Sequence, residues 1–398
     1  MLFVLKLNLV FLGLVSVSGV VCFLLDRLLL YLYEQPYRLI NEISGYLYLL
    51  FLKSYTVVYF ISIPILGVSV VIMSVLSISY VLSITGELSF VILAILTWLS
   101  LNGLLTLTVV FKKKSTNDDH FITATPATEP ELYKLSAELS RYFKVAPVKI
   151  IKITPGAEVI IKDDIATLDN VFYGCSKVMR VGLSALQFLT ANELKAMFAR
   201  QYAFYMDGEK STGLYIRRLN SYLKSATDSV LSYGFLFMLN PVALFLLLGQ
   251  AITLYLTHGF NQILELKADE RAATLCGLNR YKNAVIKYNV ETHLHENIIP
   301  NDSFRRQPGQ PMLENIYSYM KPDYSLQTNE IRKIIKRSYE ETSKSRVNRL
   351  KTPIKLRLKR LPETAPDQTE EDKPALSYLA NWRKTEDEMM ELINSGSI

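Results

Sequence analysis

The sequence predicts a mainly α-helical membrane protein with a cytoplasmic α+β domain. Half of its 398 residues are hydrophobic, a share too high for an ordinary soluble protein of this length. Long uncharged apolar runs fill most of the first 111 residues, as expected of membrane-spanning helices. The rest of the chain alternates helical and strand patterns separated by turn residues, which predicts a folded domain outside the membrane.

Residues 1–111 form the predicted membrane region, with spans at about 8–25, 55–84 and 88–111. Each run is close to or longer than the ~20 residues that a helix needs to cross the hydrocarbon core. The first run has some features of a signal peptide, but no clear cleavage motif follows it. We therefore expect an uncleaved anchor.

Basic residues indicate how the chain is oriented in the membrane. Residues 26–54 mix Arg27, Arg38 and Lys53 with Leu and Tyr, which predicts a helix lying at the membrane interface. Three lysines at 112–114 close the third run, and the positive-inside rule places them and Lys53 in the cytoplasm. We expect a multi-pass protein of the inner or plasma membrane with a cytoplasmic main domain.

Charge and cysteine content exclude two other classes. The net charge is +7, but the basic residues are spread along the chain and form no stripe interleaved with aromatics. We therefore expect no nucleic-acid partner and attribute the basicity to a membrane surface. Cys22, Cys175 and Cys276 are far apart and form no C-x-x-C pair, so neither a disulfide framework nor a cysteine zinc site is predicted.

The predicted domain covers residues 115–361, and residues 362–398 form an acidic linker and a C-terminal helix. Near its start, a helical pattern presents one face formed by Leu132, Leu135, Leu139 and Tyr142. Segments 148–153 and 157–162, separated by turn residues, predict two strands. A further strand is expected at about 177–182, passing directly into a short helix.

A helix from about 191 to 207 follows. Thr190 and Glu193 have the spacing of a capping box, in which each side chain bonds the other residue's backbone N–H. Gly208 is the expected stop of this helix.

An apolar insertion at 230–256 interrupts the domain. Pro241 lies near its middle, where a proline breaks a helix. We expect a re-entrant segment, a helix pair or an interfacial helix, with a single crossing as the alternative. An amphipathic helix comes next and is expected to end at Gly277.

The order of these features resembles the membrane-bound zinc metallopeptidases of the HtpX and type I CAAX prenyl endopeptidase kind. That family commonly reads g-L-l-x-x-L-x-x-x-E-L-x-a-V-x-A-H-E-x-x-H and later E-x-x-A-D-x-x-A. The resemblance covers roughly residues 130–361. The matching positions are Gly182, Leu183, Leu186, Glu193, Leu194, Ala199, Glu265, Ala268, Asp269, Ala272 and Gly277.

The resemblance implies a zincin-like, metallopeptidase-type domain. In such a domain two histidines at i and i+4, with a Glu from a later helix, hold zinc, and the Glu after the first His is the general base. This chain departs at these positions. Arg200 stands at the first ligand His, Gln201 at the general base and Phe204 at the second His.

These departures predict a pseudopeptidase. Arginine keeps its proton, glutamine cannot act as a base, and a phenyl ring offers no lone pair. Only Glu265 survives as a ligand position, with Asp269 as a residue that supports the ligands, so we expect no cofactor. The family also often has a His-Pro pair near the end of the domain. The corresponding residues here are Thr352-Pro353, and the spacing from them to Arg357 is one residue shorter than in the family pattern.

If the fold is kept, Arg200 faces Glu265 and Asp269. We expect its guanidinium to replace the charge of the metal and to pair with Glu265, because buried carboxylates without a partner are costly. On this hypothesis Arg200→Ala destabilises the protein by roughly 3–5 kcal/mol. The alternative is that Arg200 points to solvent and Glu265 is an ordinary surface acid.

Two other kinds of site are weaker alternatives. His258 lies two helical turns before Glu265, which allows a relocated zinc site made of His258, Glu265 and Asp269. The alternative to this relocated site is that the histidines are ordinary surface or core residues. Cys175 and Cys276 lack an assigned histidine partner and do not form a predicted nucleophilic site.

The expected function is to bind or scaffold membrane or unfolded proteins. The expected partners are the membrane, a protein or peptide, and either further copies of the chain or an active protease relative. An edge strand in 147–162 would accept an extended peptide by strand addition. There are two alternatives for the aromatic side chains of Tyr202, Phe204 and Tyr205: they line a peptide groove, or they belong to the core.

Two other functions remain open. The alternative is an active zinc endopeptidase of membrane-protein quality control with unconventional ligands. A structural or transport protein is a third class, against which the scarcity of charge in 55–111 argues.

Overall fold

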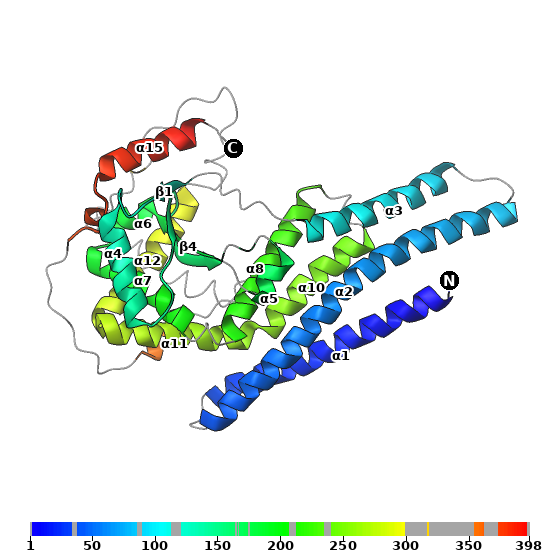
Figure 1. Ribbon diagram of the computed structural model, residues 1–398, viewed down its shortest axis with the longest axis horizontal. Helices are drawn as coiled ribbons and strands as arrows, with labels where there is room; N and C mark the ends of the chain where they lie inside the picture. The colour runs from blue at the N-terminus through cyan, green and yellow to red at the C-terminus, as the bar shows by residue number, and fades with distance from the viewer. Residues whose placement is uncertain are drawn as a thin grey trace. The chain divides into compact units, whose positions relative to one another are not determined.

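The computed structural model describes most of the chain (Figure 1). The described residues are 2–33, 38–85, 90–112, 121–163, 165, 167–173, 176–206, 212–234, 240–298, 317, 354–361 and 373–395. The chain forms two compact units. The first contains Met1–Ser115, Ile165–Gly174 and Ser211–Ile263, and the second contains Thr116–Asp164, Cys175–Lys210 and Leu264–Ile398.

The first unit is helical throughout its described residues. Its helices are α1 (Leu2–Tyr33), α2 (Arg38–Thr85), α3 (Phe90–Phe111), α5 (Leu168–Tyr173), α8 (Thr212–Leu231) and α10 (Pro241–Leu256). Three of these helices are long and apolar enough to cross a membrane, over Asn8–Leu32, Ile43–Ser83 and Val91–Phe111. The turn expected between the second and third spans falls on residues 86–89, outside the described residues.

The expected separate interfacial helix at 26–54 is wrong. Residues up to Tyr33 continue α1, and residues from Arg38 onward begin α2. Of the tyrosines in this range, Tyr48 is a core residue packed against α10, as is Tyr59 further along α2, whereas Tyr31 and Tyr46 are exposed. Tyr48 donates a hydrogen bond to the Leu256 carbonyl at 2.9 Å, and the Tyr59 ring stacks on Phe245.

The apolar insertion is divided between two helices, as its proline predicts. Its first residues end α8 at Leu231, and Pro241 occupies the first turn of α10. Asn240 caps α10 by accepting from the Val242 N–H at 2.8 Å and also donates to Thr106 Oγ1 at 2.9 Å. At Thr257 the chain bends by 49° into α11 (His258–Cys276), and the two helices together are apolar enough to form either a broken span or a re-entrant loop, so both expected alternatives stay open.

The second unit contains a small sheet with helices around it. Its strands are β1 (Ile122–Ala124), β2 (Ile150–Thr154), β3 (Val159–Asp163) and β4 (Lys177–Gly182), in the spatial order β1-β2-β4-β3. The β2–β4 pair is parallel and the other two pairs are antiparallel. Its helices are α4 (Pro130–Tyr142), α6 (Leu183–Phe188), α7 (Ala191–Met206), α12 (Leu278–Ile298), α14 (Ile354–Lys359), the 3₁₀ turn η4 (Ala375–Tyr378) and α15 (Trp382–Ser395).

The core of this unit follows the predicted patterns closely. Leu132, Leu135 and Leu139 of α4 are buried, but Tyr142 is 55% exposed because it occupies the last position of the helix. Helix α11 ends at Gly277, whose φ of +90° suits a glycine directly after a helix. The boundary between the two units lies within α11, after Ile263. The polar later part of this helix belongs to the second unit.

Candidate functional site

Helix α7 begins with the predicted capping box, which the structure confirms. The Thr190 N–H donates to Glu193 Oε2 at 2.8 Å, and the Glu193 N–H donates to Thr190 Oγ1 at 3.2 Å. Lys287 of α12 also pairs with Glu193 Oε2 at 2.9 Å. These contacts fix both the start of α7 and its alignment with α12. The expected stop, Gly208, lies outside the described residues.

Most side chains in the middle of α7 are core residues. Tyr202 and Tyr205 are fully buried. The hydroxyl of Tyr202 lies 2.5 Å from Ser136 Oγ, and that of Tyr205 donates to the Ile161 carbonyl at 3.1 Å. Because both rings are buried, they do not line an open groove. Gln201 is also buried, whereas Arg200 and Phe204 are partly exposed.

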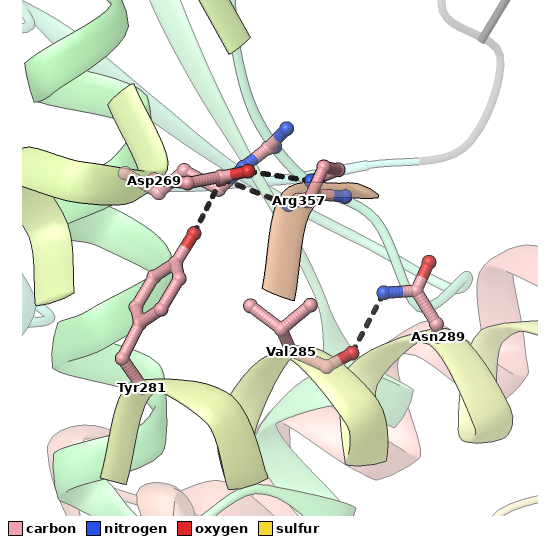
Figure 2. Close-up of polar contacts among 6 residues, drawn as sticks. Asp269, Tyr281, Val285, Asn289 and Arg357 are labelled. Atoms are coloured by element: carbon pink, nitrogen blue, oxygen red, sulfur yellow. Dashed lines mark hydrogen bonds and ion pairs between the residues drawn. The ribbon is translucent and has the colours of Figure 1, made fainter. Parts of the chain in front are cut away.

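Asp269 is the centre of a network that joins three helices to α11. Arg357 of α14 donates from Nε to Oδ2 at 2.6 Å and from Nη2 to Oδ1 at 2.9 Å. Arg200 of α7 donates from Nε to Oδ1 at 2.8 Å, and Tyr281 of α12 donates its hydroxyl to Oδ1 at 2.5 Å. Figure 2 shows Arg357 and Tyr281 converging on the carboxylate. Asp269 is 1% exposed, so this charge is removed from water.

The electrostatics of the network follow from this geometry. Burial alone raises the pKa of Asp269, but the guanidinium groups of Arg357 and Arg200 outweigh it and lower that pKa to about 2. For Tyr281, burial is the main cause of a pKa raised well above its ordinary value, and the Asp269 charge adds to it. Near neutral pH, Asp269 is therefore ionised and Tyr281 keeps its proton.

The predicted ion pair of Arg200 is present, but with Asp269 and not with Glu265. In the described part of the chain, Glu265 makes no hydrogen bond or ion pair and is only partly buried. It acts on Arg200 and Arg357 through its charge alone. The physical reason is that Asp269, one turn further along α11, is buried and needs partners, whereas solvent reaches Glu265.

Arg357 and Tyr281 are residues of this site that sequence reasoning did not assign, and for Tyr281 the sequence offered no signal. For Arg357 the only signal was the weak family match at Thr352-Pro353, whose spacing to Arg357 was one residue short. A side-on guanidinium–carboxylate contact is among the strongest polar contacts in proteins. Arg357 therefore binds Asp269 more firmly than Arg200 does.

The residues do not come together as a relocated metal site. Over the described ranges, no three His, Cys, Asp or Glu side chains are close enough to hold a metal ion. Both oxygens of Asp269 already accept hydrogen bonds, and His258 is the first residue of α11, three turns before Asp269. Residues His293 and His295 belong to α12, but their side chains lie outside the described part.

Cys276 shows no sign of nucleophilic chemistry. Cys276 is buried, and burial raises the pKa of its thiol to about 11, which keeps it protonated near neutral pH. Cys175 lies outside the described residues.

The expected peptide-accepting edge at 147–162 is only partly present. β2 lies between β1 and β4, so it has no free edge, whereas β3 is one of the two edge strands of the sheet, β1 being the other. The Gly182 N–H donates to the Glu158 carbonyl, so by alternation the backbone groups of Val159 and Ile161 point away from β4. Tyrosine hydroxyls already occupy two of these outward groups, since the Val159 N–H donates to Tyr288 at 3.0 Å and Tyr205 donates to the Ile161 carbonyl.

Comparison of the chain with known protein families, with curated proteins and with solved structures finds no match. The functional interpretation therefore depends on the geometry around Asp269 and on the family resemblance of the motifs. Arg200 belongs both to the ion-paired group around Asp269 and to the resembling motif.

Proposed function

We propose that this chain is a catalytically degenerate relative of the HtpX and type I CAAX prenyl endopeptidase kind of membrane metallopeptidase. It binds or scaffolds membrane or unfolded proteins and does not cleave them. The observation that supports this proposal is the state of Asp269, whose two carboxylate oxygens accept bonds from Arg357 and Arg200. Arg200 stands at the position where the family has its first metal ligand.

Charge and chemistry at the site argue against a bound metal. A divalent cation placed between two guanidinium groups would be repelled by both of them. Gln201 and Phe204, at the other two motif positions, supply neither a base nor a lone pair suited to zinc. The positive charge of Arg200 thus replaces that of the metal, and no cofactor is required.

The proposed setting is the inner or plasma membrane. Three helices are apolar and long enough to span it, and the basic residues at 112–114 favour a cytoplasmic position for the second unit. In this setting the protein would meet membrane proteins and unfolded cytoplasmic segments. Further copies of the chain, or an active protease relative, are the other proposed partners.

Binding without cleavage is the property to test. Purified full-length protein in detergent is incubated with a permanently unfolded, fluorescently labelled reporter protein, with and without added zinc. The expected result is a saturable complex, measured by size-exclusion chromatography, with the reporter intact on a gel. Zinc-dependent fragments would instead support the alternative of an active endopeptidase with unconventional ligands, and no complex would reject the binding role.

A further inference from the structure

The end of α4 and the loop that joins it to β2 present cationic and apolar side chains to solvent. Phe143, Val145 and Val148 of this segment are buried. Between and beside them lie five exposed residues that we call the loop surface: Arg141, Tyr142, Lys144, Lys149 and Ile150. The sequence contains no acidic residue from position 139 to position 157, so the charge carried by this segment is positive.

Hydrogen bonds hold both ends of the loop. The Val145 N–H donates to the Ser140 carbonyl at 3.0 Å, and Ser140 Oγ donates to the Val145 carbonyl at 2.8 Å. Towards β2, the Ile151 N–H donates to the Tyr133 hydroxyl at 3.2 Å. With the buried side chains, these bonds determine which residues face outward. The loop surface is therefore preorganised for a partner.

Lys144 has a left-handed backbone conformation, with a φ of +54°. It directly follows the last residues of α4, and its N–H bonds back to the Arg141 carbonyl at 3.2 Å. Glycine ordinarily takes this position, because a side chain is strained there. Burial does not offset the strain, since Lys144 is exposed. A lysine at this position therefore points to a use of its charge and not to a gain in stability.

Cations beside exposed apolar side chains match the surface of an acidic membrane. Lys and Arg are attracted to acidic head groups, whereas tyrosine and aliphatic side chains enter the boundary between head groups and acyl chains. Tyr142 is 55% exposed and Ile150 is 39% exposed, so both are accessible for such a contact. The third candidate span ends at Phe111 and the second unit begins at Thr116, which keeps a bilayer within reach of this unit.

We infer that the loop surface docks on a membrane surface that contains acidic phospholipids. Its three cations lie against lipid phosphates, and Tyr142 and Ile150 enter the head-group region. The contact attaches the second unit to the bilayer in addition to the candidate spans. It does not depend on the proposed binding of unfolded proteins, so each can fail without the other.

The first measurement asks whether position 142 contacts lipid. Full-length Tyr142→Trp is reconstituted into nanodiscs whose phosphatidylcholine carries bromine near the head-group end of its acyl chains, with or without phosphatidylglycerol. Bromine quenches tryptophan fluorescence on contact, and wild type gives the signal of the native Trp98 and Trp382 for subtraction. The added tryptophan should be quenched strongly with phosphatidylglycerol and weakly without it. Asp387→Trp, at an exposed position of α15, is the control and should be quenched in neither.

Charge variants then identify the residues that respond to the acidic lipid. Lys144→Gln/Lys149→Gln, combined with Tyr142→Trp, should weaken the attraction to the lipid by about 30-fold and reduce the quenching towards the value without phosphatidylglycerol. Arg383→Gln/Lys384→Gln removes the same charge from exposed residues of α15 and should leave the quenching unchanged. Because all four side chains are exposed, both double variants should fold.

Lys144→Gly separates function from stability at the strained position. Glycine accepts the left-handed conformation, so this variant should unfold at a higher temperature than wild type. In the Tyr142→Trp background it should nevertheless reduce the quenching, because the cation is lost.

Four results would overturn the inference. Absence of quenching at position 142 with phosphatidylglycerol would show that another partner, or none, meets the loop surface. Equal quenching with and without phosphatidylglycerol would reject recognition of acidic lipid. Undiminished quenching in Lys144→Gln/Lys149→Gln would assign the contact to other residues. A lower unfolding temperature of Lys144→Gly would show that the lysine has a structural role.

Discussion

Arg357 binds Asp269 side-on, with Nε 2.6 Å from Oδ2 and Nη2 2.9 Å from Oδ1. Arg200 reaches the same carboxylate through Nε alone, at 2.8 Å. Arg357 thus uses two nitrogens on the buried aspartate, whereas Arg200 uses one, and no described residue accepts from its terminal nitrogens. This difference predicts that the two arginines contribute unequally to the stability of the fold.

The two arginines should differ in their contribution to stability. Arg357→Ala leaves a buried carboxylate without its main partner and should cost about 3–5 kcal/mol of unfolding free energy. Arg200→Ala removes one hydrogen bond to a charge and should cost about 1.5–3 kcal/mol, less than the sequence-based hypothesis requires. Denaturant unfolding of detergent-solubilised protein measures both, with Arg141→Ala as a control that should change stability by no more than about 0.5 kcal/mol. A larger loss for Arg200→Ala than for Arg357→Ala would contradict this division.

The pKa of Asp269 predicts a specific loss of stability in acid. Its folded-state pKa of about 2 lies below the unfolded value of about 3.9, so the ionised form stabilises the folded state. This contribution, about 2 to 3 kcal/mol, is complete above the unfolded pKa and is lost as the pH falls through about 2. The stability advantage of wild type over Asp269→Asn should be constant above pH ~5 and shrink below pH ~4. An advantage independent of pH over this range would show that Asp269 is not an ionised partner of the arginines.

The capping box should contribute to the stability of α7. Thr190→Ala removes the acceptor for the Glu193 N–H and should cost about 0.5–2 kcal/mol. Each side chain bonds the backbone of the other residue. The double variant Thr190→Ala/Glu193→Ala should therefore lose less unfolding free energy than the sum of the losses of the two single variants. A double-mutant cycle measures this coupling. Strict additivity would mean that Glu193 acts mainly through Lys287.

A carboxylate in the first candidate membrane helix should stabilise the start of α11. Asp26 is fully buried and accepts from the Gly259 and Phe260 N–H groups, both at 2.9 Å. Asp26→Ala should therefore cost about 1.5–3 kcal/mol or more, measured by thermal unfolding in detergent. Gly259→Ala should also be destabilising, since an added Cβ would lie 2.6 Å from Asp26 Oδ2. Asp228→Ala, on an exposed face of α8, is the control, and a loss as large as that of Asp26→Ala would reject the capping role.

Local features of the fold were predictable because local signals determine them. The capping box, the helix break before Pro241 and the end of α11 at Gly277 each depend on residues within a few positions of one another. The apolar character of the three candidate spans is likewise visible in short windows of sequence.

Features that depend on distant segments were not predictable. Tyr48 lies 208 residues from the carbonyl that it binds, so nothing near it in the sequence distinguishes a core tyrosine from an interfacial one. Arg357 and Asp269 are 88 residues apart, and no pattern predicts their pairing. The position of β4 beside β2 similarly depends on a crossover and not on turn residues.

The zinc content of the protein shows whether Arg200 occupies the place of a metal ion. Full-length protein is purified in detergent without exposure to any chelator, and zinc per chain is measured by elemental mass spectrometry. Only trace metal is expected, far below one zinc per chain, with the same value in Arg200→Lys. One zinc per chain, lost when His258 or Glu265 is replaced, would contradict it and identify an unconventional metal site.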